Sequence, residues 1–479
     1  MTNANEKSYI LQDVKPPPPT IQQTSPEGET VFVDDTKQLV SPDNKTDENN
    51  AEEEVSSMPY ASFNYINSII GSGVIAMPYA LSMSGFWLGI ILLILVAIIT
   101  DYSLIIMVKG GHLSQTNSYQ GLVEAAFGRP GFYILSFLQC VYPVIGMISY
   151  NVIISDTITK ILVRITKLPQ TSILGNRKFV VILSTLLITL PLSLLRKMSK
   201  LAKISFISLI FILFILIVLL IRAGTLGPKI PPTENAWEFA NAGVMQAIGI
   251  MSFAFMCHHN AFLLYSSLEN PTQARWNKVT HASIIASFIL LVILGVTGYA
   301  TFTGLSQGDV LENFCLDDDL INVIRLFFAL TVMLTFPIEC FVCREVIENV
   351  FFINYTKPQS FKVHYITTVS IVAVTVVISM ATDCLGIVLE LNGILTAVPL
   401  AYILPGLSYL KLEDGSIFST KKLPALLTAF FGIIVAMCGL ITTILRFPES
   451  EQCSHGAEME YCRKDNASLS FDSTLQSIP

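Results

Sequence analysis

Small and polar residues interrupt two apolar segments of this chain where a membrane helix should be regular. Gly71-Ser72-Gly73 interrupts the first long apolar run, and Ser252–Asn260, which ends in three strongly polar side chains, interrupts a run at 240–265. In hydrocarbon, backbone groups without helical partners are tolerated only where protein seals them or where they line a polar cavity. Unwound backbone there supplies N–H groups for an anion and carbonyls for a cation. The interruptions predict two halves of a site for a small charged solute.

Each interruption also has a simpler interpretation. Gly71 and Gly73 would allow close packing between membrane helices. His258 and His259 could lie near the end of a continuous helix and hydrogen-bond to their neighbours. Consecutive residues of a helix point about 100° apart, however, so His258, His259 and Asn260 cannot all face one partner. Local unwinding explains both patterns together.

The composition requires a membrane protein. The chain has 479 residues, of which 52% are hydrophobic and 14% charged, and its mean hydropathy is +0.60. Soluble domains are more polar. We therefore predict an all-α polytopic protein with about eleven transmembrane helices, since about twenty apolar residues cross a bilayer. The expected spans are 60–83, 86–109, 131–163, 177–195, 201–222, 240–265, 279–303, 319–350, 363–381, 385–410 and 423–446.

The charge pattern predicts the topology. Residues 1–57 hold the excess of acidic residues and few aromatic ones, which predicts a disordered cytosolic tail. Basic residues favour the connections on the same side as this tail, termed the inner side. Residues 58–446 then form the transmembrane domain, and residues 447–479 an extracellular or lumenal tail. On that side Asn466 is a glycosylation acceptor, and a Cys453–Cys462 disulfide is feasible.

Several charged residues fall within the spans. Asp101 is about 12 Å from the inner end of the second span, where an ionised carboxylate must be paired, protonated or turned to a cavity. His258 is its best titratable companion by depth, and together they could relay protons. A structural Asp101, hydrogen-bonded to the backbone of its own repeat, is the alternative. Arg325, Glu339 and Glu390 are near span ends, where solvation is expected.

The motifs resemble those of a known family. Phe63-Asn64-x-x-Asn67-x-x-x-Gly71-Ser72-Gly73, followed by Pro78-Tyr79-Ala80, and Phe253-Ala254-Phe255-x-Cys257-His258 are similar to motifs of the sodium-coupled neutral amino acid transporters, in the amino acid/auxin permease superfamily. The resemblance covers about residues 58–446 and extends to vacuolar amino acid exporters of fungi. It implies a LeuT-like fold of five-plus-five inverted repeats in which helices 1 and 6 are broken.

The resemblance also implies where a substrate binds. In the unwound segment Gly71–Gly73, the N–H groups of Ser72 and Gly73 would face the substrate carboxylate at a half-helix N-terminus. Carbonyls near Ser252 and Ala254 would accept the α-ammonium group. Phe253 and Phe255 would either shape the side-chain pocket or pack as core.

A sodium site in this family is formed by spans one and eight. Asn67 matches the first contribution, and Thr331 and Thr335, four residues apart on one helix face, match the second. The alternative for both threonines is a hydrogen bond to the carbonyl four residues earlier. Sodium is thus the expected coupling ion, and no other cofactor is implied.

These features predict a secondary active transporter of neutral amino acids, sodium-coupled and with proton counter-transport as an option. The expected location is the plasma membrane or an endolysosomal membrane. A proton-coupled exporter of an acidic organelle is the second reading, and a nutrient receptor that signals through residues 1–57 is the third. No phosphate-binding loop, nucleophile elbow or metal motif suggests an enzyme. Partners are the amino acid, its coupling ions and lipid; nucleic acid is not expected, and a protein partner stays open.

Overall fold

The computed structural model describes residues 56–169, 171–195, 199–351, 361–382, 384–446 and 459–462. The expected tail of residues 1–57 lies outside the described residues except for its last two, and Asn466 and Cys453 lie outside them entirely.

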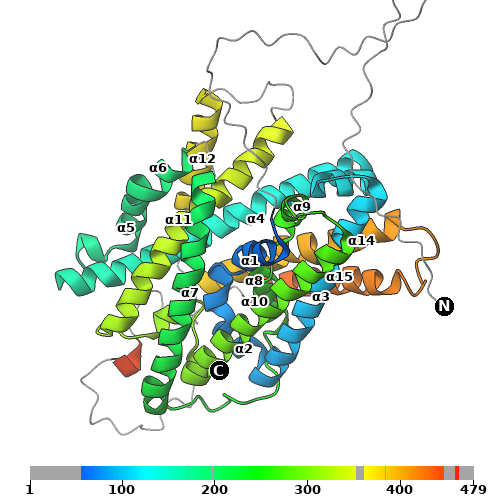
Figure 1. Cartoon of the computed structure of the whole chain (residues 1–479). Helices are drawn as coiled ribbons and strands as arrows, with labels where there is room; N and C mark the ends of the chain where they lie inside the picture. The colour runs from blue at the N-terminus through cyan, green and yellow to red at the C-terminus, as the bar shows by residue number, and fades with distance from the viewer. Residues whose placement is uncertain are drawn as a thin grey trace, which may run out of the picture.

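Helices account for nearly all of the described chain, as predicted (Figure 1). In this part of the chain, nine helices are long and apolar enough to cross a membrane, or ten if the bent pair at its start counts as one span. The helices are α1 (Met58–Ile69), α2 (Met77–Ser84), α3 (Phe86–Ser114), α4 (Tyr119–Thr166), α5 (Arg177–Ser184), α6 (Leu190–Ser193), α7 (Ser199–Leu226), α8 (Val244–Ala254), α9 (Ala261–Ser266), α10 (Gln273–Phe302), α11 (Asp319–Phe351), α12 (Phe361–Ser379), α13 (Leu385–Asn392), α14 (Leu404–Leu412) and α15 (Leu423–Arg446).

The expected span at 177–195 is the one that does not reach full length. Helices α5 and α6 are joined there by a π-helical turn at Thr185–Thr189 into one helical run that ends at Ser193. This run is shorter than the roughly twenty residues of a typical span. It packs against α4 and α11 and completes the bundle beside them.

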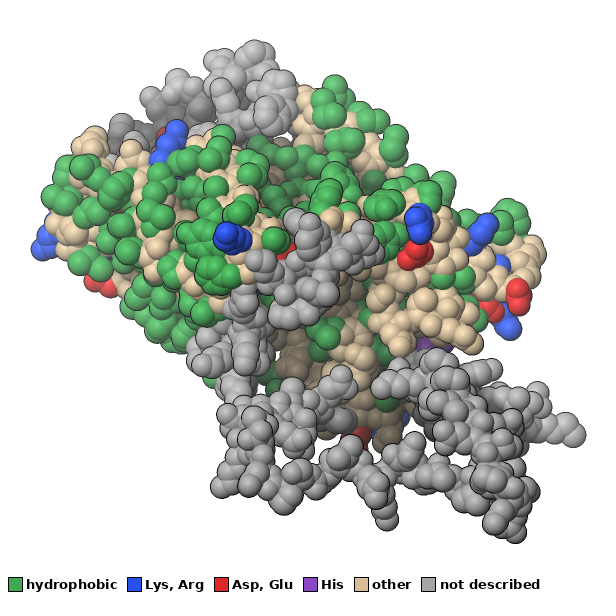
Figure 2. Space-filling model, turned by 90° about the horizontal axis from the view of Figure 1, so that it is seen from above, with side chains coloured by type: hydrophobic (Ala, Val, Ile, Leu, Met, Phe, Trp, Pro, Cys, Tyr) green, Lys and Arg blue, Asp and Glu red, His purple; other side chains and the backbone are tan. Residues whose placement is uncertain are grey.

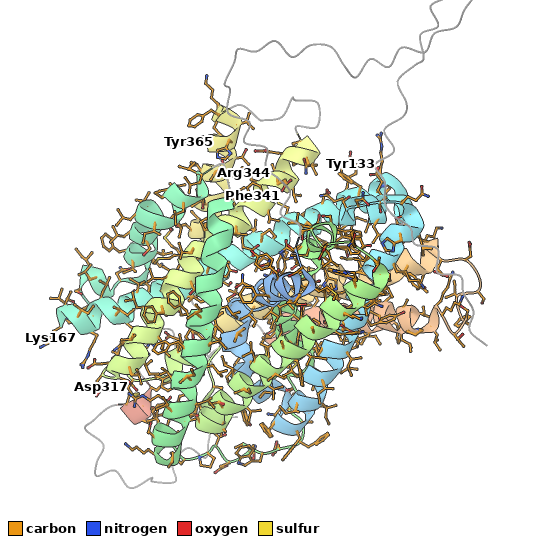
Figure 3. All side chains as sticks on the ribbon, viewed as in Figure 1. Tyr133, Lys167, Asp317, Phe341, Arg344 and Tyr365 are labelled. Carbon is orange, nitrogen blue, oxygen red and sulfur yellow. A yellow bond between two sulfur atoms is a disulfide. The ribbon has the colours of Figure 1, made fainter. Side chains whose placement is uncertain are left out.

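Helices α4 and α11 are the long helices that the sequence predicted, and they form the most extensive helix contact of the described structure. Near one end, Arg164 of α4 meets Asp319 of α11 at 3.0 Å. Near the other, Cys140 Sγ and Cys343 Sγ are 3.4 Å apart. Figure 3 shows Arg344 and Phe341 of α11 at the end opposite Lys167 and Asp317. The two helices are therefore antiparallel, in a register fixed at both ends.

The surface agrees with a protein that faces lipid. Apolar side chains cover most of the described surface in Figure 2, and charged side chains are few and scattered. Large apolar side chains such as Phe137, Leu187 and Ile98 are more than half exposed. In water such a surface would promote association, but in a bilayer it is the expected outer face.

The structure corrects the predicted disulfide. Cys462 is bonded to Cys315, which lies in the segment between α10 and α11, and not to Cys453. The prediction chose the nearest cysteine in the same tail. It could not anticipate that a short turn at Glu460–Cys462 folds back onto a segment 147 residues earlier, where Tyr461 donates a hydrogen bond of 2.5 Å to the Asn313 carbonyl.

Candidate functional site

The first break lies where the sequence placed it. Helix α1 ends at Ile69, and Gly71 leads into a tight 3-10 turn at Ser72–Ala76, which continues into α2. The two halves of the span meet at an angle of 53°. Ser72 and Gly73 are buried, and the Ser72 hydroxyl lies beside the hydroxyl of Tyr150 on α4.

The second break is also as predicted. Helix α8 ends at Ala254, a 3-10 turn follows at His258–Asn260, and α9 begins at Ala261. The continuous helix considered for His258 and His259 is thereby excluded. His258 is fully buried, its Nε2 is 3.3 Å from Ser103 Oγ, and its Nδ1 has no partner among the described residues.

The two breaks are in direct contact. A Cβ placed on Gly73 would be 2.8 Å from Ala254 Cα and 3.1 Å from the Phe253 ring, so only glycine fits here. Asn260 Nδ2 donates a hydrogen bond of 2.8 Å to Ser68 Oγ at the end of α1. Figure 1 shows α9 beside α1 near the centre of the bundle. Residues almost two hundred positions apart therefore form one unwound region, as the paired motifs indicated.

Helix α4 supplies a third wall, which the sequence analysis missed. Tyr150 Oη lies beside Ser72 and is 4.0 Å from the position of a Cβ on Gly71. The Tyr142 ring is 5.9 Å from the Phe253 ring and 5.5 Å from the His259 ring. Both tyrosines are buried and lie on one face of α4, eight residues and thus two turns apart. The sequence signal for this wall is the pair of tyrosines two helical turns apart within the expected span 131–163.

The remaining predicted substrate residues occupy the last turn of α8. Ser252 donates its hydroxyl proton to the Ile248 carbonyl at 2.7 Å. Phe253 reaches both Gly73 and Tyr142, whereas Phe255 is fully buried among apolar residues of the core. Phe253 is thus the aromatic residue of the pair that lies between the break and α4. Whether any of them contacts a substrate stays a prediction.

The predicted sodium ligands are less closely placed. Thr331 donates to the Phe327 carbonyl at 3.0 Å and Thr335 to the Thr331 carbonyl at 2.9 Å, the local bonding considered as the alternative. Their hydroxyl lone pairs remain available to a cation. Helix α1, which carries Asn67, packs mainly on α10, α7 and α9, and no hydrogen bond between described residues joins Asn67 to either threonine.

Asp101 does not pair with His258. Its Oδ2 lies 2.7 Å from Nδ1 of His281 on α10, which packs along α3. The pair lies in an apolar cavity of about 260 Å³ between these helices, lined also by Ile94, Ala97, Ile98, Ile284, Ile285 and Phe288. The exposed isoleucines of this cavity place it on the lipid-facing side, away from the breaks. The predicted pair was wrong because depth along a helix does not reveal the lateral neighbour.

Of the three charges expected near solvated span ends, Arg325 and Glu390 are buried and Glu339 is half-buried. Arg325 is fully buried and donates to the carbonyls of Leu311 and Phe314, each at 2.7 Å. Glu390 is buried and accepts a hydrogen bond from Thr443. Glu339 Oε2 is buried and has no hydrogen-bond partner among the described residues. The prediction was wrong for Arg325 and Glu390 because helices α11 and α13 carry these two positions into the packed bundle.

A short segment covers the region from the outer side. The 3-10 turn Val310–Asn313 contacts the turn Ser72–Ala76 and is joined to α4 by Lys160 Nζ and Glu312 Oε2 at 2.7 Å. Burial raises the pKa of Asp309, next to this turn, to about 7, while Lys160 beside Glu312 helps to hold the pKa of Glu312 below its ordinary value despite burial. This segment therefore combines a buried ion pair with a carboxyl group that titrates near neutral pH.

A helical bundle in which two broken spans meet at a common unwound point is the architecture of a membrane transporter. The chain belongs to the family described as transmembrane amino acid transporter protein, whose model matches residues 54–445. The resemblance predicted from the motifs is thus confirmed, and the protein is an integral multi-pass membrane protein.

Named relatives are similar over most of the chain. It is 49% identical to the putative sodium-coupled neutral amino acid transporter 11 of Danio rerio, over 86% of this chain and 91% of the relative. Identity to the human protein of the same name is 46%, over 81% and 94%. Vacuolar amino acid transporter 2 of Saccharomyces cerevisiae is 30% identical, over 85% and 86%.

Solved structures confirm the LeuT-like fold. A manganese transporter mutant of Eremococcus coleocola matches with a TM-score of 0.52 and 15% identity, over 82% of this chain and 88% of that chain. MhsT in complex with L-phenylalanine also matches with a TM-score of 0.52, at 13% identity, over 80% and 98%. At these identities the matches show the fold alone.

Proposed function

We propose that the protein carries neutral amino acids across a membrane by secondary active transport coupled to sodium. The observation that supports this most is the contact between the two broken spans at Gly73 and Ala254, which gathers unwound backbone from both halves of the bundle. The N–H groups of Ser72 and Gly73 bind the substrate carboxylate, and the carbonyls at the end of α8 accept the ammonium group. The names of the relatives support the substrate class and the ion. The proposal includes no catalytic step.

Asn67, Thr331 and Thr335 are the proposed sodium ligands. One sodium ion gains about 2.3 kcal/mol per 100 mV of membrane potential, enough for useful accumulation of substrate. Asn67→Ala and Thr335→Ala should remove the sodium dependence of uptake while the protein still reaches the membrane. Thr442→Ala, which removes a hydroxyl with the same local bonding on α15, is the control and should transport normally.

The full chain in liposomes, given a panel of amino acids under a sodium gradient or a proton gradient alone, tests the function. Accumulation driven by sodium supports the proposal. Accumulation driven only by protons would instead favour the second candidate, an exporter of an acidic organelle, which the similarity to a vacuolar transporter supports. Absence of flux for every amino acid would reject transport and favour a receptor role, tested by deleting residues 1–55 and measuring substrate-dependent signalling in cells.

A further inference from the structure

The cavity that holds Asp101 and His281 has one polar end and an apolar body. It lies between α3 and α10, which run alongside each other (Figure 1), and its volume is about 260 Å³. In the predicted topology α3 runs inward and α10 outward, so Ile94 and Phe288, which line the cavity, are both on the outer side of the pair. Each is seven residues from its partner in the pair, or about 10 Å along the helix. The cavity therefore extends from the pair toward the middle of the membrane.

The polar end lies a short way below the inner membrane surface. Lys278 precedes His281 by less than one turn of α10, and Lys109 follows Asp101 on α3 by eight residues, about 12 Å. Lysines near span ends mark the level of the lipid head groups, because their amino groups reach toward water. The pair is thus just inside the hydrocarbon of the inner leaflet, at the level where head groups give way to apolar chains.

The imidazole of His281 is open to lipid. Its side chain is 53% exposed, whereas that of Asp101 is 18% exposed. The Nδ1 atom is 2.7 Å from Asp101 Oδ2, and no described residue is hydrogen-bonded to Nε2. A ring nitrogen without a partner is costly where no water can reach it. The geometry leaves Nε2 for a polar group on a molecule that is itself dissolved in the membrane.

A hydroxyl group fits this nitrogen in either protonation state of the pair. Nε2 donates when it carries a proton and accepts when it does not, and a hydroxyl group can do both. A carboxylate, as in a fatty acid, is disfavoured because Asp101 would repel it. The rest of the molecule must be apolar, since the other walls are Ala97, Ile98, Ile284 and Ile285. One hydroxyl group at the end of a compact apolar body is the chemistry of a sterol.

We propose that the cavity between α3 and α10 binds a sterol, whose hydroxyl group is hydrogen-bonded to His281 Nε2 and whose rings lie against Ile94 and Phe288. Ile98 and Ile285 are more than half exposed, so the cavity opens to lipid and the sterol enters it from the inner leaflet. One face of the sterol rests on the protein and the other stays in lipid. Because the sterol contacts two helices that it does not contact in the unfolded chain, it stabilises the folded protein.

Photolabelling in liposomes tests the site. The full chain is reconstituted with a cholesterol analogue that carries a photoreactive diazirine, and the labelled peptides are identified by mass spectrometry. We expect labels on α3 and α10 at the cavity, displaced by excess cholesterol but not by the same excess of phosphatidylcholine or diacylglycerol. Cholesterol should also raise the thermal unfolding midpoint of the protein.

Two variants separate the polar contact from the space. His281→Phe keeps an apolar ring but removes the hydrogen bond, and should weaken cholesterol-displaceable labelling about 2- to 10-fold, the range for one hydrogen bond. Ala97→Leu fills the cavity and should block the labelling. Ala373→Leu, at an exposed position of α12, is the matched control and should be labelled like the wild type.

Labelling that excess cholesterol does not displace, or that phosphatidylcholine displaces equally well, would show ordinary surrounding lipid and overturn the proposal. Displacement by diacylglycerol in preference to cholesterol would assign the cavity to another lipid and also overturn it. Wild-type labelling in either variant, with the protein folded, would do the same. If His281→Phe does not fold, Ala97→Leu decides the outcome. The result is independent of the proposed transport function, because no amino acid enters the assay.

Discussion

Replacement of Gly73 by alanine should disrupt the contact on which the site depends. The new Cβ would be 2.8 Å from Ala254 Cα and 2.9 Å from its Cβ, whereas ordinary contacts are 3.4 to 4 Å. The neighbour is backbone and cannot rotate away, so the two breaks must separate by about 0.6 to 1.2 Å, the difference between these distances. Overpacking of this size costs about 1 to 3 kcal/mol. Since 1.4 kcal/mol is a factor of ten, a substrate held by both breaks should bind about 5- to 150-fold more weakly.

Gly224→Ala, on α7 and outside the site, is the matched control. A Cβ at Gly224 would meet nothing within 4 Å. The assay is initial uptake into liposomes against substrate concentration, together with thermal unfolding of the purified protein. Gly73→Ala should raise KM strongly, and Gly224→Ala should resemble the wild type. A Gly73→Ala protein with wild-type KM and stability would refute the direct contact between the two breaks.

Three further predictions concern the segment between α10 and α11, which contains Asp309, Glu312 and Cys315. Cys462→Ser should lower the free energy of unfolding by about 2 to 5 kcal/mol, measured by denaturation without reductant, whereas Cys438→Ser, at an exposed free thiol, should be neutral. Lys160→Met leaves Glu312 buried without its partner and should destabilise the protein by about 3 to 5 kcal/mol; a normal unfolding midpoint would show that the pair is not buried. Because the pKa of Asp309 is raised to about 7, the folded protein retains a proton that the unfolded chain releases near its ordinary pKa, so stability is full in acid and falls as pH rises through about 7. Asp309→Asn should reduce the fall in unfolding midpoint between about pH 5 and about pH 8, and an unchanged pH profile would contradict the assignment.

The breaks could be predicted from sequence because they violate a local rule. Gly71-Ser72-Gly73 and His258-His259-Asn260 are incompatible with a continuous lipid-facing helix, so their conformation is encoded within a few residues. The long helices α4 and α11 were likewise readable from the length of their apolar runs. Helix breaks and helix lengths, which depend on residues close together in the chain, can therefore be predicted from the sequence.

Side-chain contacts between different helices could not be predicted from the sequence in the same way. Asp101 meets His281, and Cys462 meets Cys315, through packing between helices that no periodicity within a single segment specifies. Arg325 was placed near solvent because its distance from a span end was counted along the sequence. Its burial depends on the carbonyls of Leu311 and Phe314, which belong to the segment before α11.

The inner halves of the two broken spans are fastened together at both ends. At one end Asn260 is bonded to Ser68, and at the other Ser56 pairs through its backbone with Ser267 and Glu269, at 2.7 and 2.9 Å. Each hydrogen bond contributes about 1 kcal/mol net, so a conformation in which α1 swings alone lies about 3 kcal/mol higher and is populated about a hundredfold less. Helices α1 and α9 therefore move together as one rigid unit. Opening toward the inner side moves the inner halves of both broken spans at the same time.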